Sequence, residues 1–290
     1  MVAVVTPMDS DGGIDYAAFA KLVDFHVAAG TEALVVAGTT GESATLDHDE
    51  HVELIDRACE IAAGRIPIVA GTGSNSTAQT LGLSRAVDRL PIAGFLVVTP
   101  YYNKPTQEGL RRHFTAVADA VTHPVILYNV PGRTGVDLKP ATTIMLAAHD
   151  NIVGVKDATG ELDRVRTLRD GAGPAFMLLP GDDGTACEFM LLGGDGVISV
   201  TANVAPAAMR KLCDAARAGR RPEAERIDST LRDLHTTLFS ESNPIPVKWA
   251  LERMGFVGPG IRLPLTPLAE AHHAAVSAAL RTAGIAHASA

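Results

Sequence analysis

A lysine near the end of a buried apolar run is the residue best placed for covalent chemistry. Lys156 follows Val155 in the run 151–159, and by strand parity its side chain shares a face with Ile152 and Gly154. A free lysine is almost wholly protonated at neutral pH, whereas burial disfavours the ammonium form. A neutral amine can attack a ketone and form an imine. The alternative is a strand-end lysine that reaches solvent or pairs with Asp157, and the local pattern leaves both interpretations open.

A tyrosine occupies the comparable place in the preceding apolar run. Tyr128 lies in the run 124–131, so its strand should neighbour the lysine strand. A phenol within hydrogen-bond reach of reacting atoms can pass protons while an imine forms and a carbon–carbon bond is made. An inward tyrosine is more often a core residue with a satisfied hydroxyl, so this signal supports the lysine hypothesis without proving it.

Two segments have the composition expected of a carboxylate-binding site. The 38–43 loop, with the sequence Gly-Thr-Thr-Gly-Glu-Ser, offers adjacent hydroxyls and backbone N–H groups, and it lacks the Gly-Lys-Ser/Thr ending of a Walker A loop. Arg133 follows the tyrosine run, and its guanidinium could bind a carboxylate through two hydrogen bonds. A loop arginine is usually only solvated, so the chemistry of Arg133 stays open at this point.

Histidines provide the only candidate metal ligands. His48 and His51 lie one helical turn apart beside Asp49 and Glu50. A metal site is conceivable there, but an exposed first helical turn is the simpler interpretation, and we expect no metal.

Eight short apolar runs must position these residues. The runs are continuously apolar, as expected for parallel strands buried on both faces, and they cover 2–7, 33–38, 66–73, 94–100, 124–131, 151–159, 175–183 and 196–203. Helical patterns fill the gaps, the first between Asp15 and Gly30 and the second between Asp47 and Gly64. Eight strand–helix units predict an α/β fold of the (β/α)8 TIM-barrel type, whose active site lies at the carboxyl ends of the strands.

The pattern changes after about residue 219. No further strand runs occur, and three helices are expected, the last beginning with Thr266 and Pro267 as N-cap and first residue. Its predicted apolar stripe contains Leu268, Ala271, Ala275 and Val276. We therefore expect a catalytic barrel over residues 1–219 and a C-terminal helical domain over residues 220–290.

Composition excludes several classes of protein. The chain has 290 residues, a net charge of −8 and no long basic run, which argues against binding nucleic acid or anionic membranes. No signal peptide or membrane span is apparent, so a cytoplasmic location is expected. Cys59, Cys187 and Cys213 are far apart and form no CxxC pair, which indicates reduced thiols and no zinc site.

Ordered motifs along nearly the whole chain resemble one known family. The strings VAVVTPMD, GTTGESATLDHDEH, AGTGSN, VTPYYNKP, LYNVPGRTG, GVKDATG, GDD, GVISVTANV and NPIPVKWA are similar to dihydrodipicolinate synthases with a helical C-terminal domain. GTTGE and the tyrosine–lysine arrangement are shared by the wider pyruvate-dependent aldolase superfamily. The string YNVPGRTG is more discriminating, because its arginine is typical of the synthases. The N-terminus looks a few residues shorter than in relatives, so a short first strand is expected.

The resemblance implies a reaction and a role for each site residue. Pyruvate would form a Schiff base and condense with L-aspartate-4-semialdehyde to give 4-hydroxytetrahydrodipicolinate, the committed step of diaminopimelate and lysine biosynthesis. No metal, nucleotide or other cofactor would be needed, and the protein would be a homotetramer made of tight dimers. The implied roles are the nucleophile Lys156, a proton relay of Tyr128, Thr39 and Tyr102 (the last from a neighbouring subunit), pyruvate contacts from Thr40, Ile198 and Gly181, and a semialdehyde contact from Arg133.

The resemblance also implies an inhibitor site in some members, which bind lysine at a dimer-interface cleft. The matching positions are Ser43, Ala44, His48, His51, Asn75 and Tyr101. This chain departs from inhibited relatives at Gln79, where those relatives carry a glutamate. A neutral amide is a weaker partner than a carboxylate for the ammonium of lysine, so weak or absent inhibition is expected.

Three alternatives remain at this stage. Another pyruvate aldolase acting on a sugar acid would share Lys156 and Tyr128 but would not need Arg133. A non-catalytic, pyruvate-sensing or scaffold barrel would need a broken relay, yet Thr39, Tyr102, Tyr128 and Lys156 are all present. A metal-dependent barrel hydrolase is least favoured, because the strand ends carry no ligand cluster.

Overall fold

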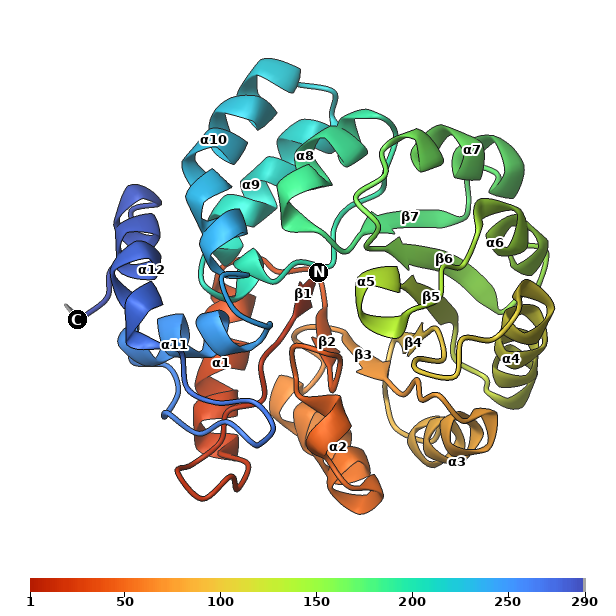
Figure 1. Ribbon diagram of the computed structural model, residues 1–290, viewed down its shortest axis with the longest axis horizontal. Coiled ribbons are helices and arrows are strands. Elements are labelled where there is room, and N and C mark those ends of the chain that lie inside the picture. Colours follow the sequence, from red (N-terminus) through yellow and green to blue (C-terminus); the bar gives the residue numbers. More distant parts are fainter. Residues whose placement is uncertain (289–290) are drawn as a thin grey trace.

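A single parallel sheet curves through the centre of the molecule and is surrounded by helices (Figure 1). The computed structural model describes residues 1–288. In that range, seven strands follow one another in chain order, each paired parallel with the next. They are β1 Val2–Ala3, β2 Leu34–Val36, β3 Ile68–Gly71, β4 Gly94–Val98, β5 Val125–Asn129, β6 Ile152–Asp157 and β7 Met177–Pro180.

The ring closes through a segment that is not a regular strand. The amide of Ile198 donates to the carbonyl of Pro180 on one side, and the amide of Ala3 donates to the carbonyl of Ser199 on the other. The prediction of a strand over 196–203 is therefore only partly right. The Asp183 carboxylate accepts hydrogen bonds from the amides of Val200 and Thr201, and this draws the chain into the 3₁₀ turn η2, Thr201–Asn203. The barrel itself is confirmed.

Within residues 1–288, nine α-helices accompany the strands before the C-terminal region, and the first two begin as predicted. Asp15 accepts a hydrogen bond from the amide of Ala18, and Asp47 accepts one from the amide of Glu50. These helices are α1 Tyr16–Ala28, α2 His48–Ala62, α3 Thr77–Val87, α4 Gln107–Ala120, α5 Pro131–Thr134, α6 Pro140–Leu146, α7 Asp163–Ala172, α8 Asp183–Leu191 and α9 Pro206–Arg217, with the 3₁₀ turn η1 at Ser43–Thr45.

Three C-terminal helices lie together at one side of the barrel (Figure 1): α10 Arg221–Thr237, α11 Ile245–Arg253 and α12 Glu270–Thr282. The predicted start of α12 is wrong, because Thr266 and Pro267 lie in an exposed loop and Ala269 is the N-cap residue. The predicted stripe is also wrong in part, since Ala271 and Ala275 are exposed. The helix contacts α10 and α11. Its buried residues Val276, Ser277, Ala279 and Leu280 lie in its second half, and His273 in its first half stacks on Trp249 of α11.

Apolar side chains form two clusters that separate the two faces of the sheet. The larger cluster lies between strands and helices. The smaller one fills the barrel and contains Ala3, Ala33, Val35, Val69, Leu96, Ile126, Tyr128, Val130, Leu179 and Ile198. Ile152 belongs to the outer cluster, so the prediction that it shares a face with Lys156 is wrong. A register shift between β5 and β6, at Val125 and Ile126, interrupts the alternation before Gly154.

Candidate active site

Lys156 and Tyr128 lie side by side inside the barrel. They face each other in the register of β5 and β6, and Tyr128 belongs to the inner cluster. Lys156 is only 5 % exposed, and its Nζ lies 4.2 Å from the centroid of the Tyr128 ring. Among the described residues no carboxylate forms an ion pair with Lys156, and Asp157 bonds instead to Thr159. The alternatives of a solvent-seeking or Asp157-paired lysine are thus rejected.

Gly181 leaves the space that the Lys156 side chain occupies. A Cβ atom built on Gly181 would lie 2.7 Å from Cε of Lys156 and 2.8 Å from Cβ of Ala158. Such contacts cannot be accommodated without moving the lysine, so glycine is required here by close approach. Ile198 lies at the neighbouring position of the inner cluster, with its amide bonded to the carbonyl of Pro180.

The 38–43 loop is a tight turn that folds onto itself. The amides of Gly41 and Ser43 both donate to the carbonyl of Gly38, and the amide of Glu42 donates to that of Thr39. These three amides are therefore not free for a ligand, and the prediction of an open nest of N–H groups in this loop is wrong for them. Thr40 is buried and Thr39 is half-buried.

Asn243 connects the loop threonine to Arg133, and sequence reasoning missed it. Its Nδ2 donates to Oγ1 of Thr40 at 3.0 Å, and its backbone carbonyl accepts from Nη2 of Arg133 at 3.2 Å. Arg133 itself is exposed on α5. Asn243 is buried just before α11, and the only signal for it was the asparagine that opens the string NPIPVKWA.

A buried ion pair fixes the same loop from the C-terminal side. Nζ of Lys248 lies 2.5 Å from Oε1 of Glu42, and their side chains are 5 % and 0 % exposed. The amide of Arg262 donates to the other Glu42 oxygen, while its guanidinium binds Glu50. Burial lowers the pKa of Lys248 below its ordinary value, and the Glu42 carboxylate opposes that effect. Lys248 and Arg262 were not predicted.

The two tyrosines after β4 point away from the buried pair. Tyr102 is 88 % exposed and has a φ of 72°, in the left-handed region that is costly for a non-glycine residue. Its amide donates to the carbonyl of Thr134, which ties the turn to α5. Within one chain, Tyr102 therefore remains outside the barrel, and Tyr101 beside it is also exposed.

The predicted inhibitor residues lie after β2, β3 and β4, partly in the loops and partly in the helices α2 and α3. Ser43 and Ala44 are in η1, and Asn75 accepts a hydrogen bond from Asn103 through its carbonyl. Oε1 of Gln79 accepts one from Ser74. His48 is exposed as predicted, but His51 is buried with Nε2 2.7 Å from the carbonyl oxygen of Gly71, so the expectation of an exposed turn is wrong for it. Burial lowers the pKa of His51.

Neither a metal cluster nor a membrane span is found in the part of the chain that the structure describes. Across residues 1–288, no group of three or more His, Cys, Asp or Glu side chains is arranged to hold a metal. No helix in that range has the length and apolar character needed to cross a membrane.

A parallel α/β barrel with a buried lysine beside a tyrosine at its strand ends defines a barrel enzyme. The chain matches the Dihydrodipicolinate synthetase family over residues 1–283 and belongs to it. A 4-hydroxy-tetrahydrodipicolinate synthase from Thioalkalivibrio sulfidiphilus is 58 % identical over 285 residues, covering 98 % of this chain and 97 % of the relative. One from Cellvibrio japonicus is 54 % identical, with 98 % of each chain covered.

Solved structures agree with this assignment. The chloride-inhibited dihydrodipicolinate synthase from Acinetobacter baumannii, complexed with pyruvate, is 52 % identical with a TM-score of 0.96 over 98 % of each chain. The dihydrodipicolinate synthase from Aquifex aeolicus is 42 % identical with a TM-score of 0.96, covering 99 % of this chain and 98 % of that one. The predicted family, TIM-barrel fold and lyase function of the synthase type are confirmed.

Proposed function

We propose that the protein condenses pyruvate with L-aspartate-4-semialdehyde through an imine on Lys156, giving 4-hydroxytetrahydrodipicolinate for diaminopimelate and lysine biosynthesis. The observation that carries this proposal is the Lys156 amine, which is buried, lacks a carboxylate partner among the described residues, and lies over the Tyr128 ring at 4.2 Å. A lysine amine held at this position can attack a carbonyl and form an imine.

The proposed reaction needs no cofactor beyond the lysine itself. The amine of Lys156 adds to the pyruvate ketone, and the carbinolamine loses water to give the imine. Loss of a methyl proton gives an enamine, whose carbon attacks the aldehyde, with Tyr128 moving protons. The amine of the product then displaces Lys156, closes the ring and frees the enzyme.

The remaining residues would bind substrates and complete the relay. Thr40 would hold the pyruvate carboxylate, with Asn243 fixing the orientation of its hydroxyl. Ile198 would present its carbonyl to pyruvate, and Gly181 would line the pocket. Thr39 and Tyr102 would join Tyr128 in the relay, and the 88 % exposure of Tyr102 fits a side chain given to a neighbouring subunit.

We also propose a homotetramer made of tight dimers, a cytoplasmic location and no nucleic-acid or membrane partner. The net charge of −8 supports the last point. The division into a barrel of residues 1–219 and a helical domain of residues 220–290 is proposed too, since its boundary falls between α9 and α10.

The first test is a coupled assay. The purified protein is mixed with pyruvate and aspartate semialdehyde, and a dihydrodipicolinate reductase reports product through NADPH oxidation. Turnover that requires both substrates supports the proposal. Absence of turnover with folded protein and competent reductase would favour the alternative of a pyruvate aldolase acting on a sugar acid, and sugar-acid aldehydes would be tested next.

Arg133 separates these two aldolases. We expect Arg133→Ala to raise the KM for aspartate semialdehyde roughly 10- to 100-fold, because a charge-assisted contact to a carboxylate is worth about 1.5–3 kcal/mol. The KM for pyruvate should change little. Steady-state kinetics with each substrate varied in turn measures both constants. An unchanged KM for the semialdehyde would remove Arg133 from the site.

Lysine inhibition is expected to be weak or absent. Gln79 offers no negative charge to a ligand ammonium, and its Oε1 already accepts a hydrogen bond from Ser74. We expect Gln79→Glu to lower the lysine concentration for half-inhibition by about tenfold, the difference between a neutral and a charge-assisted hydrogen bond. Inhibition curves of the two proteins provide the comparison, and sub-millimolar inhibition of the unmodified protein would contradict the expectation.

A further inference from the structure

We propose that Arg164 is a positioning residue that holds the ends of β5 and β6 and the loop after α5 in one rigid frame. This proposal rests on the roles given above to Lys156, Tyr128 and Arg133. Arg164 lies on α7, outside the barrel, and its side chain is only 11 % exposed. It would act through other residues, since it reaches no group inside the barrel that the reaction uses.

Asn129 and Asp157 connect the frame to the catalytic pair, Tyr128 and Lys156. Asn129 directly follows Tyr128, Asp157 directly follows Lys156, and the two are paired in the register of β5 and β6. Because side chains alternate along a strand, Asn129 and Asp157 point to the outer face, opposite to Tyr128 and Lys156. Both are at least 95 % buried, so fixing them fixes the backbone from which the pair projects.

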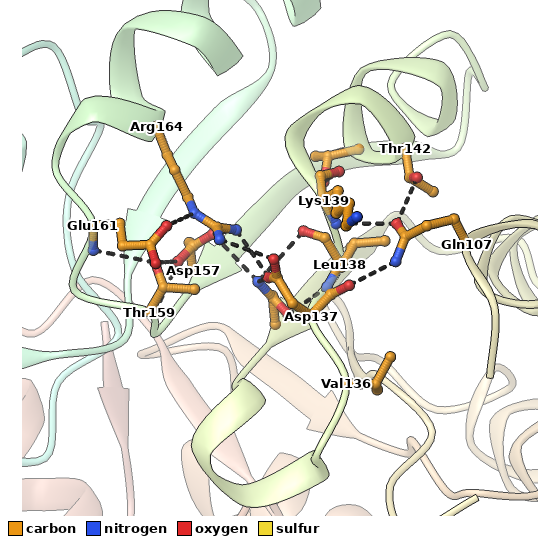
Figure 2. A network of polar contacts seen from close by, with 12 residues as sticks. Gln107, Val136, Asp137, Leu138, Lys139, Thr142, Asp157, Thr159, Glu161 and Arg164 are labelled. Carbon is orange, nitrogen blue, oxygen red and sulfur yellow. Dashed lines mark hydrogen bonds and ion pairs between the residues drawn. The ribbon is translucent and has the colours of Figure 1, made fainter. Parts of the chain in front are cut away.

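Asp137 connects the frame to the loop after α5. Its two carboxylate oxygens accept one hydrogen bond each, at 2.9 Å, from the two terminal nitrogens of Arg164 (Figure 2). Oδ1 also accepts from Nδ2 of Asn129 at 2.8 Å. Burial alone would raise the pKa of Asp137, but the hydrogen bonds from Arg164 and Asn129 lower it below its ordinary value. Asp137 stands four residues after Arg133, so the same contact restrains the segment that carries the substrate arginine.

The side-chain amide of Asn129 joins the strand ends to the loop after α5. Asn129 donates from Nδ2 to Asp137 and accepts at Oδ1 from the amide of Leu138 at 2.9 Å. The far side of the loop is held by Gln107, which donates to the carbonyl of Asp137 and accepts from the amide of Lys139. Figure 2 shows these contacts converging on Asp137 from both sides, with Arg164 extending between Asp157 and Asp137.

Charge explains why an arginine is needed. Nη1 of Arg164 lies 3.7 Å from the Asp157 carboxylate, and its Nε donates to Glu161 at 2.6 Å. Arg164 is thus the cation that pairs with all three carboxylates, while the charge of Lys139 acts on Asp137 alone among them. Without the guanidinium, the carboxylates of Asp157 and Asp137 would face each other across the gap and repel, so the loop would move away from the strand ends. A lysine supplies the charge but not the planar set of donors that hydrogen-bonds Asp137 and Glu161 together.

Loss of Arg164 is expected to displace both the Lys156–Tyr128 pair and Arg133 from their reactive positions. A displacement of about 1 Å at a reacting group can cost roughly 100-fold in rate. We therefore expect Arg164→Ala to slow imine formation with pyruvate by at least about tenfold and to raise the KM for the semialdehyde by a similar factor. Arg164→Lys should recover part of both losses.

Two further variants test the loop side of the frame separately and provide a control on the same helix. Asp137→Asn removes the charged contact on the loop side only, so it should raise the KM for the semialdehyde about fivefold while imine formation stays within about twofold of the unmodified rate. Arg166→Ala is the matched control, because Arg166 lies on the same helix, is 91 % exposed and forms an ion pair with Asp170 at 3.8 Å. It should leave both quantities unchanged.

The rate of imine formation is measured by borohydride trapping with pyruvate alone, and the trapped protein is quantified by intact mass. The KM is measured by the coupled assay. Both are measured at a temperature where circular dichroism shows each variant folded. Trapping in the unmodified protein and none in Lys156→Ala establishes the proposed nucleophile independently. If Arg164→Ala lowers only the melting temperature and leaves both kinetic quantities unchanged, Arg164 merely stabilises the fold and the proposal is overturned. If Arg164→Ala does not fold, an unchanged KM in Asp137→Asn overturns it as well.

Discussion

Replacing Lys156 with alanine is expected to lower kcat by roughly 10³-fold or more, because the covalent path through the imine disappears with the amine. The protein should remain folded. Among the described residues Lys156 has no carboxylate partner, so its removal leaves no uncompensated buried charge and only opens space beside Tyr128.

Two matched variants make this result specific. Lys156→Met keeps most of the side-chain length and fills the same space without a nucleophile, so it should be as inactive as the alanine variant. Lys211→Ala removes an exposed lysine on α9 and should keep full activity. The coupled assay measures turnover, and circular dichroism verifies the fold. Retained turnover in either Lys156 variant would refute the nucleophile assignment.

The barrel and the catalytic pair could be predicted because their signals are local. Parallel strands buried on both faces appear as continuous apolar runs, and a lysine or tyrosine inside such a run is conspicuous. Tyr128 and Lys156 are the penultimate residues of the consecutive strands β5 and β6, and adjacent parallel strands bring their ends together. Even here the local argument failed at Ile152, since a register shift between neighbouring strands cannot be read from either strand alone.

The residues that complete the site could not be predicted because their partners are remote. Asn243 bonds to Thr40 across 203 positions, Lys248 to Glu42 across 206, and Arg262 to Glu42 across 220. In sequence, each is an ordinary polar residue in or beside a helical region. The packing of the C-terminal region against the barrel buries Asn243 and Lys248 and brings the half-buried Arg262 to Glu42. Burial is what turns a surface charge into a structural requirement. The proposed division at residue 219 thus describes chain order better than it describes the site.

The buried pair Glu42–Lys248 leads to the largest expected effect on stability. Lys248→Met leaves the Glu42 carboxylate buried without its cation, with the Arg262 amide as a remaining donor. We expect the free energy of unfolding to fall by about 3–5 kcal/mol, the cost of removing one partner of a buried ion pair. Equilibrium unfolding in guanidinium chloride measures the change, and the KM for pyruvate should rise as the 38–43 loop loosens.

The double variant Glu42→Gln/Lys248→Met distinguishes a buried charge from lost packing. With the carboxylate also removed, no uncompensated charge remains, so most of the lost stability should return, because a buried pair replaced as a unit is often close to neutral. Arg220→Met breaks the half-exposed pair with Glu223 and should cost less than about 1 kcal/mol. If the double variant is as unstable as Lys248→Met, the loss comes from packing around the lysine stem. Recovery of stability without recovery of the KM for pyruvate would show that the pair sets the geometry of the loop, and that the C-terminal helices are part of the substrate site through Glu42.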